Sequence, residues 1–159
     1  MNNNIKICLL GGPKTGKTSW ILRHITGDFK EPYILTTGSH VFNLPYEESG
    51  KMYGLQIVDG EISHLYPGSF AAIAFYTQDC MDKTDELVKD FKLACPNALI
   101  INVWSFSDTK DFAVFQRRVC QYREILVRGG RKTWIISGKS NYNFDKPFLD
   151  IVQDYKKVM

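Results

Sequence analysis

The eight residues at positions 11–18 constrain the fold of this chain more than any other feature. They read Gly-Gly-Pro-Lys-Thr-Gly-Lys-Thr and fit the pattern G-x-x-x-x-G-K-[ST]. The apolar run Ile5 to Leu10 comes directly before them, and a helical segment follows. In this context the glycines let the backbone curl so that successive N–H groups face an anion at the helix N-terminus. The sequence therefore predicts an α/β fold with a phosphate-binding loop.

The side chains of this loop have separate predicted roles. Lys17 is expected to reach the β- and γ-phosphates of a nucleoside triphosphate, and the hydroxyl of Thr18 is expected to ligate Mg²⁺. The other predicted contacts come from Gly12, Pro13, Lys14, Thr15, Gly16 and Ser19. Pro13 has no N–H to donate, so one phosphate contact is missing there. The alternative, a glycine turn with a surface lysine, is disfavoured by the length, order and flanking strand of the motif.

Four short apolar runs rich in β-branched residues are predicted strands. They are Ile5 to Leu10, Ala71 to Tyr76, Ala98 to Val103 and Thr133 to Ile136. Apolar residues recur at steps of three and four in three other stretches, which predicts helices at Leu87 to Ala94, Phe112 to Leu126 and Phe148 to Tyr155. Because a parallel connection needs a crossover, this alternation favours a parallel sheet covered on both faces.

Two extended segments interrupt the alternation. Val41 to Tyr46 and Met52 to Val58 are joined by the polar residues 47–50, and this pattern predicts an antiparallel hairpin. The sequence shows no internal repeat and no linker between domains. The predicted architecture is a single three-layer α/β domain over residues 1–159, with a mostly parallel sheet and one antiparallel hairpin strand.

Composition excludes several classes of protein. The 159 residues carry a net charge of only +3, and no basic run favours direct nucleic-acid binding. The four cysteines have no C-x-x-C spacing, which favours free thiols in a reducing compartment. The first apolar run is too short for a signal peptide or a membrane span, and no cysteine near Met159 offers a lipid anchor. These features predict an intracellular protein.

Four segments resemble the Ran GTPases of the Ras superfamily. Residues 5–18, 23–29 and 33–38 are similar to the start of these proteins. Residues 136–149, Ile-Ser-Gly-Lys-Ser-Asn-Tyr-Asn-Phe-Asp-Lys-Pro-Phe-Leu, are similar to the segment that carries their last guanine-contact motif and opens the final helix. The middle of the chain matches only in pattern. The resemblance implies a P-loop GTPase (Ras-like) fold.

The resemblance also implies further binding residues. Thr36 would bind Mg²⁺ and the γ-phosphate, and Phe29 would pack its ring against the base. Asp59 follows an apolar strand, where its carboxylate could hold Mg²⁺ through water. The loop contacts to the base would come from Ser137, Gly138 and Lys139.

The implied function is that of a Ran-like molecular switch. Such a protein binds GTP and GDP with Mg²⁺, and it binds Ran-type regulators or transport receptors in nucleocytoplasmic transport. We accordingly expect a monomer in the cytoplasm and the nucleus, with no membrane anchor and no direct contact to nucleic acid.

The sequence departs from Ran after Asp59. Residues 60–68 read Gly-Glu-Ile-Ser-His-Leu-Tyr-Pro-Gly, without the family's D-T-A-G-Q sequence. The glutamine that orients the attacking water has no counterpart, so we expect weak hydrolysis. Glu61 or His64 could hydrogen-bond a water molecule, but neither has a spacing that a mechanism requires, and both are interpreted as solvated loop residues. The catalytic residue is left unassigned.

A second departure concerns the base. The family's N-K-x-D sequence should follow the strand at Ala98 to Val103, where this chain has Trp-Ser-Phe-Ser-Asp at 104–108. Asp108 lies one residue out of register, and the Asn-Lys pair is missing. Loss of this hydrogen-bonding pair reduces discrimination between bases. Trp104 is an alternative, less selective contact, because aromatic rings stack on any base. We therefore expect relaxed base specificity.

Two alternatives remain open. One is a hydrolysis-deficient module that retains nucleotide as a structural element and occupies Ran partners without a catalytic cycle. The other is a small phosphotransferase in which Arg128 and Arg131 form a mobile lid around a glycine pair. A turn before the strand at Thr133 accounts better for that glycine pair.

Overall fold

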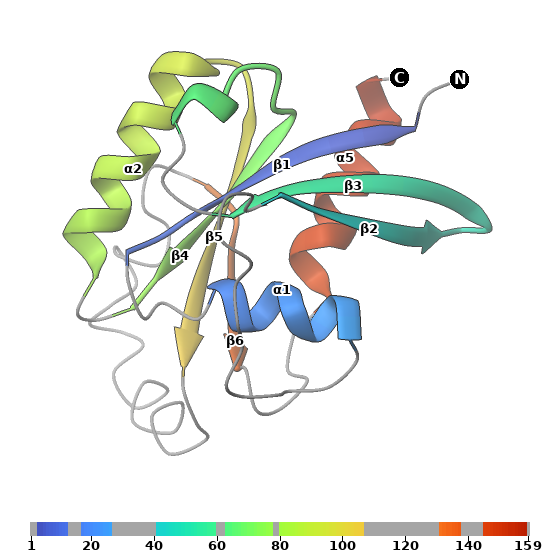
Figure 1. Ribbon diagram of the computed structural model, residues 1–159, viewed down its shortest axis with the longest axis horizontal. Coiled ribbons are helices and arrows are strands. Elements are labelled where there is room, and N and C mark those ends of the chain that lie inside the picture. The colour runs from blue at the N-terminus through green and yellow to red at the C-terminus, as the bar shows by residue number, and fades with distance from the viewer. Residues whose placement is uncertain are drawn as a thin grey trace.

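Strands and helices alternate along the chain in the computed structural model (Figure 1). It describes residues 3–12, 17–26, 41–59, 63–77, 80–106, 131–137 and 145–158. The elements in this part of the chain are β1 (Asn4–Leu10), α1 (Lys17–Thr26), β2 (Val41–Glu48), β3 (Lys51–Asp59), the 3-10 helix η1 (Ser63–Leu65), β4 (Ala71–Tyr76), α2 (Met81–Ala94), β5 (Leu99–Phe106), β6 (Thr133–Ser137) and α5 (Lys146–Val158).

The six described strands form one sheet in the order β2-β3-β1-β4-β5-β6. β2 is antiparallel to β3, and the other neighbouring strands are parallel, which confirms the predicted sheet and hairpin. Between β2 and β3, Ser49 has φ 52° and Gly50 has φ 77°. Positive φ at both central residues is typical of the tight hairpin turns whose twist matches that of the flanking strands.

Two hydrophobic layers enclose the sheet. Along β1, Ile7 and Leu9 point toward α1 and α5, whereas Cys8 and Leu10 point toward α2. The buried residues of β4 alternate in the same way, since side chains of a strand point to opposite faces. α1 and α5 thus cover one face and α2 covers the other, which confirms the predicted three-layer fold (Figure 1).

The end of β5 differs from the prediction. We expected the strand to end at Val103, but it runs to Phe106. Trp104 is only 1% exposed, and its ring stacks on that of Tyr76 with centroids 5.8 Å apart and planes at 23°. Tertiary packing therefore extends the strand into a stretch that looks like a loop in sequence.

The described helices agree with the predicted periodicity. α2 buries Leu87 and Phe91 on one side and ends at Ala94, just before Cys95 and Pro96. α5 buries one stripe of residues, namely Pro147, Phe148, Ile151, Val152 and Tyr155. Its last turn carries two lysines, whose positive charges interact favourably with the negative end of the helix dipole. The helix predicted at 112–126 lies outside the described residues.

Candidate functional site

The carboxyl ends of β1 and β3 lie side by side. Leu9 of β1 pairs with Asp59, the last residue of β3. Gly11 and Gly12 follow β1 directly and are buried, and Lys17 begins α1. Ligands of open α/β sheets bind outside the carboxyl ends of the strands, so the fold places three predicted site residues, Gly12, Lys17 and Asp59, at this edge.

The donor set at this edge fits Mg²⁺. Asp59 is 2% exposed and contributes a carboxylate at the end of β3. Within the described ranges, no three His, Cys, Asp or Glu side chains gather as metal ligands. Mg²⁺ commonly uses one or two carboxylates together with substrate phosphates and water. A nucleotide's phosphates would therefore supply the ligands that the described protein residues do not.

The backbone of Gly12 closely approaches the first turn of α2. A Cβ atom built on Gly12 would lie 3.1 Å from Cγ of Lys83 and 3.4 Å from Sγ of Cys80. The aliphatic part of Lys83 therefore packs beside the phosphate loop. We did not single out either α2 residue from the sequence, because only the folded arrangement of β1 and α2 brings them to Gly12.

The strands that precede the predicted base-contact segments also end together. Ser137, the last residue of β6, pairs with Phe106, the last residue of β5. The chain therefore leaves both strands at one point of the sheet edge, as expected for segments that contact one base. Asp108 lies outside the described residues.

Several predicted site residues remain predictions. Pro13, Lys14, Thr15, Gly16, Phe29, Thr36, Gly138 and Lys139 lie outside the described residues, as do Glu61 and Arg128. Thr18 and Ser19 belong to the first turn of α1, and Ser137 is the last residue of β6. The structure describes the backbone of these three residues only.

The second half of the connection between β3 and β4, residues 66–69, is fixed to the body of the fold. Tyr66 is 2% exposed, and its ring lies 5.4 Å from that of Phe91. Its carbonyl accepts hydrogen bonds from Ser69 Oγ at 2.7 Å and from Cys95 Sγ at 3.0 Å. Lys6 Nζ donates to the next carbonyl, that of Pro67, at 2.9 Å. These contacts fasten residues 66–69 to α2 and to the sheet, whereas His64 of η1 is exposed.

The three cysteines in the described residues, Cys8, Cys80 and Cys95, are free thiols, as predicted for that part of the chain. Burial raises the pKa of the Cys8 thiol, although its hydrogen bond with Ser69 opposes the shift. Cys8 therefore remains a protonated, unreactive core residue at neutral pH.

Two interpretations of single residues were wrong. Trp104 is buried against Tyr76 and offers no ring face to a base. Arg131 does not form a lid: its Nε donates to Asn102 Oδ1 at 3.0 Å and its Nη2 to the Tyr76 hydroxyl at 3.1 Å. The Tyr76 hydroxyl in turn donates to Asp85 of α2 at 2.7 Å. Arg131 is therefore part of an internal polar network.

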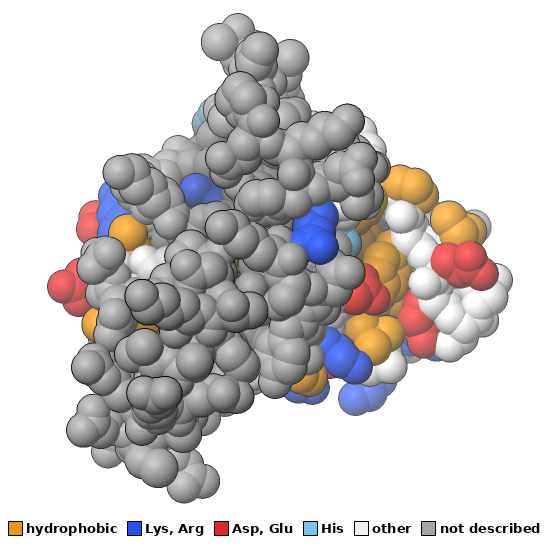
Figure 2. Space-filling model, turned by 90° about the horizontal axis from the view of Figure 1, so that it is seen from below, with side chains coloured by type: hydrophobic (Ala, Val, Ile, Leu, Met, Phe, Trp, Pro, Cys, Tyr) orange, Lys and Arg blue, Asp and Glu red, His pale blue; other side chains and the backbone are white. Residues whose placement is uncertain are grey.

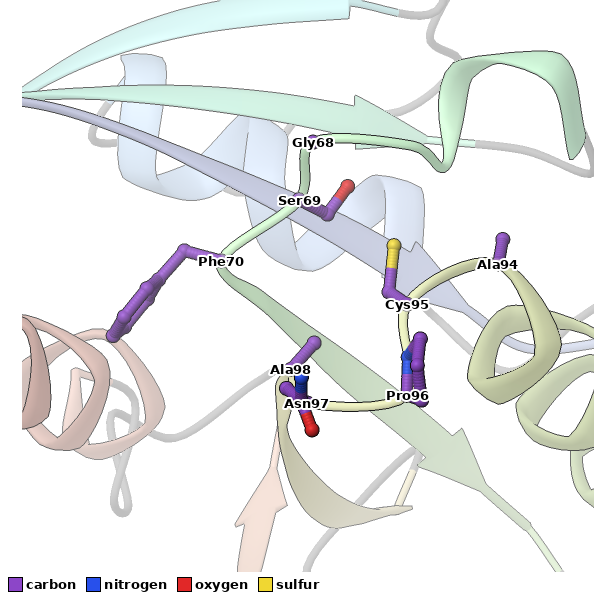
Figure 3. Close-up of a pocket in the computed structure, with 8 residues that line it drawn as sticks. All are labelled: Gly68, Ser69, Phe70, Ala94, Cys95, Pro96, Asn97 and Ala98. Carbon is purple, nitrogen blue, oxygen red and sulfur yellow. The ribbon is translucent and has the colours of Figure 1, made fainter.

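A separate pocket of about 290 Å³ lies at the opposite edge of the sheet (Figure 3). Residues 68–70 line it on one side and residues 94–98 on the other, next to the amino ends of β4 and β5. Gly12 and Asp59 are at the carboxyl edge. This pocket is therefore distinct from the candidate nucleotide site.

Comparison with known protein families agrees with the fold. Residues 6–157 match the Ras family, whose members are small GTPases that bind GTP and GDP, generally with Mg²⁺. The match spans both the phosphate loop and the last helix. The chain therefore belongs to the Ras family and is a small GTPase-type nucleotide-binding switch.

Proposed function

We propose that this protein is a Ran-like switch that binds GTP and GDP with Mg²⁺ and hydrolyses GTP slowly. The observation that carries this proposal is the placement of Gly12, Lys17 and Asp59 at one edge of the sheet. The Ran subtype is supported by the similarity of residues 23–29 and 136–149 to Ran.

Slow hydrolysis is supported by the connection between β3 and β4. It has no glutamine, and residues 66–69 are fastened away from the carboxyl edge. Only residues 60–62 separate Asp59 from η1. Because catalysis of phosphoryl transfer depends mainly on positioning water and stabilising charge, so short a connection offers few groups to orient water.

The proposed cellular role is in nucleocytoplasmic transport. In this role the protein would act as a monomer and meet Ran-type regulators or transport receptors through the segment around Thr36, in the cytoplasm and the nucleus. Among the described helices, none is long and apolar enough to cross a lipid bilayer.

The second candidate is a hydrolysis-deficient module that occupies Ran partners. The contacts of Tyr66 and Pro67 favour it, because they leave residues 66–69 little freedom to rearrange with the state of the nucleotide. Such a module would retain GTP and would not convert it to GDP by its own hydrolysis.

Single-turnover hydrolysis separates the two candidates. Protein loaded with radiolabelled GTP is incubated with Mg²⁺, and release of phosphate is followed at 25 °C. For the slow switch we expect turnover about 100-fold below that of a Ras-family protein that has the glutamine, because the attacking water is poorly oriented. Retention of intact GTP without turnover would support the module instead. Turnover equal to that of the glutamine-containing protein would contradict both candidates.

Base preference can be measured by competition. GTP, ATP, CTP and UTP are titrated against a fluorescent triphosphate in the presence of Mg²⁺. Without the N-K-x-D sequence, we expect the affinity for GTP to exceed that for the other nucleotides by no more than about tenfold. The hydrogen-bonding pair that normally recognises guanine is absent. A preference for GTP of several orders of magnitude would show that this chain recognises guanine by another arrangement.

A further inference from the structure

The backbone of Gly12 is in contact with another element at the point where the chain leaves β1. A Cβ atom built on Gly12 would lie 3.1 Å from Cγ of Lys83, and 3.4 Å from both Cβ and Sγ of Cys80. Both residues belong to the start of α2, and Figure 1 shows the start of this helix next to the end of β1. The stem of Lys83 therefore occupies the space that a side chain at position 12 would need.

This contact explains the glycine at position 12. The glycines with positive φ in the described part of the chain are Gly50 and Gly68. Gly12 thus has a backbone conformation that other residues can adopt, and the remaining reason for a glycine is close approach of another group. A distance of 3.1 Å is shorter than most contacts of a real Cβ atom. Even one methyl group at position 12 would therefore push the Lys83 stem aside.

The first turn of α2 is fixed to the sheet by hydrogen bonds. Thr84 is fully buried, and its hydroxyl donates to the Phe75 carbonyl at 2.7 Å. The next residue, Asp85, accepts a hydrogen bond from the Tyr76 hydroxyl at 2.7 Å. Phe75 and Tyr76 are the last two residues of β4. Because Thr84 and Asp85 follow Lys83 directly, these bonds hold the backbone of Lys83 in place beside the carboxyl edge of the sheet.

Helix stability does not explain a lysine at this position. Lys83 lies in the first turn of α2, where the positive end of the helix dipole favours acidic side chains such as that of Asp82. Lys83 is nevertheless partly buried there, whereas Lys89 and Lys92 of the same helix are exposed. Departures from a local rule are expected at functional sites. The packing of the Lys83 stem on Gly12 is the gain that the structure shows.

We propose that Lys83 is a positioning residue for the phosphates of a nucleoside triphosphate, acting through the backbone of Gly12. At the other end of the phosphate loop, Lys17 begins a helix whose Trp20 and Ile21 are buried in the core. Gly12 has no side chain to anchor it, so the stem of Lys83 limits its movement. A binding loop that is already ordered loses less conformational entropy on binding and so holds its ligand more tightly. This inference rests on the proposed nucleotide-binding function, because it concerns the loop predicted to hold that ligand.

The test compares two variants of Lys83 by titration of a fluorescent methylanthraniloyl GTP in Mg²⁺. Lys83→Ala removes the part of the stem that contacts Gly12. We expect it to bind the nucleotide about three to ten times more weakly than the wild type, because the loop must then be ordered on binding. Lys83→Met removes the charge and keeps an unbranched stem, so we expect it to restore most of the affinity.

A substitution at the other side of the contact gives an independent test. Gly12→Ala places a methyl group against the Lys83 stem, and we expect it to weaken binding at least about threefold. In a chain that also carries Lys83→Ala, the methyl group enters the space left by the stem, and the contacts with Cys80 at 3.4 Å remain. The double variant should therefore bind no more weakly than Lys83→Ala alone. Additive losses would overturn the inference, because the two positions would then act separately.

A control variant separates this contact from the charge and stability of the helix. Lys89→Ala removes an exposed lysine from the same helix and should leave the affinity unchanged. Thermal unfolding of every variant is measured alongside. If the loss of affinity follows the loss of stability across the variants, Lys83 supports the fold as a whole, and the inference is overturned.

The remaining outcomes distinguish this inference from the proposed function. If the wild type binds the labelled triphosphate and Lys83→Ala binds it equally well, only the inference is overturned. Binding by Lys83→Met as weak as that by Lys83→Ala would overturn it too, because the ammonium group and not the stem would then be responsible. If the wild type binds no labelled triphosphate, the proposed function fails and the inference falls with it.

Discussion

Replacing Lys17 with alanine is expected to weaken binding of a nucleoside triphosphate by about 30-fold or more while leaving the fold intact. Lys17 is half-buried at the start of α1, next to the loop that follows β1. Truncating one partner of a close, desolvated charge pair costs about 2–5 kcal/mol, and 1.4 kcal/mol corresponds to a factor of ten in affinity. The phosphates would lose their nearest predicted cation.

A fluorescent triphosphate titrated in Mg²⁺ measures the effect, and circular dichroism with a thermal melt reports on the fold. Lys51→Ala is the matched control, because it removes the same charge at the exposed start of β3, at the end of the strand opposite Asp59. We expect the affinity of this control to equal that of the wild type. An unchanged affinity in Lys17→Ala would refute the assignment of the phosphate site.

Phe148→Ala should have the largest effect on stability. Phe148 is fully buried, and its ring lies 4.7 Å from the rings of both Trp20 and His24. It also contacts Tyr46, so one side chain joins α1, α5 and β2. Truncating a buried phenylalanine typically costs about 3–5 kcal/mol, a large part of the 5–15 kcal/mol that stabilises an ordinary domain.

Urea unfolding followed by tryptophan fluorescence gives this loss in the free energy of unfolding. Leu93→Ala is a suitable control, since Leu93 on α2 is 78% exposed and its truncation should change stability by no more than about 0.5 kcal/mol. A loss below about 1 kcal/mol for Phe148→Ala would mean that the site collapses around the missing ring and that these aromatic contacts contribute little.

The layers, the parallel sheet and the hairpin follow from patterns that are local in sequence. Runs such as Ala71 to Tyr76 are apolar apart from the Tyr76 hydroxyl and are therefore expected to be covered on both faces, as β4 is. The end of β5 could not be predicted in the same way. Ser105 resembles the start of a loop, and only the stacking of Trp104 on Tyr76 shows why the strand continues.

The same distinction applies to the candidate site. Gly12, Lys17 and Asp59 could be assigned because each belongs to a short motif or to the end of an apolar strand. The approach of Lys83 to Gly12 depends on how elements distant in sequence pack together. No local spacing encodes such a contact, so the sequence gives no signal for it.

The position of β2 also has a consequence for how this protein behaves at high concentration. Among the described strands β2 is the outermost on its side of the sheet, and Pro45 removes one backbone donor from it. Glu47 is exposed near its end. Figure 2 shows acidic and hydrophobic side chains together at the right of the molecule. Proline and charge both make an edge strand a poor template for a strand of another molecule. This edge of the sheet therefore resists intermolecular aggregation.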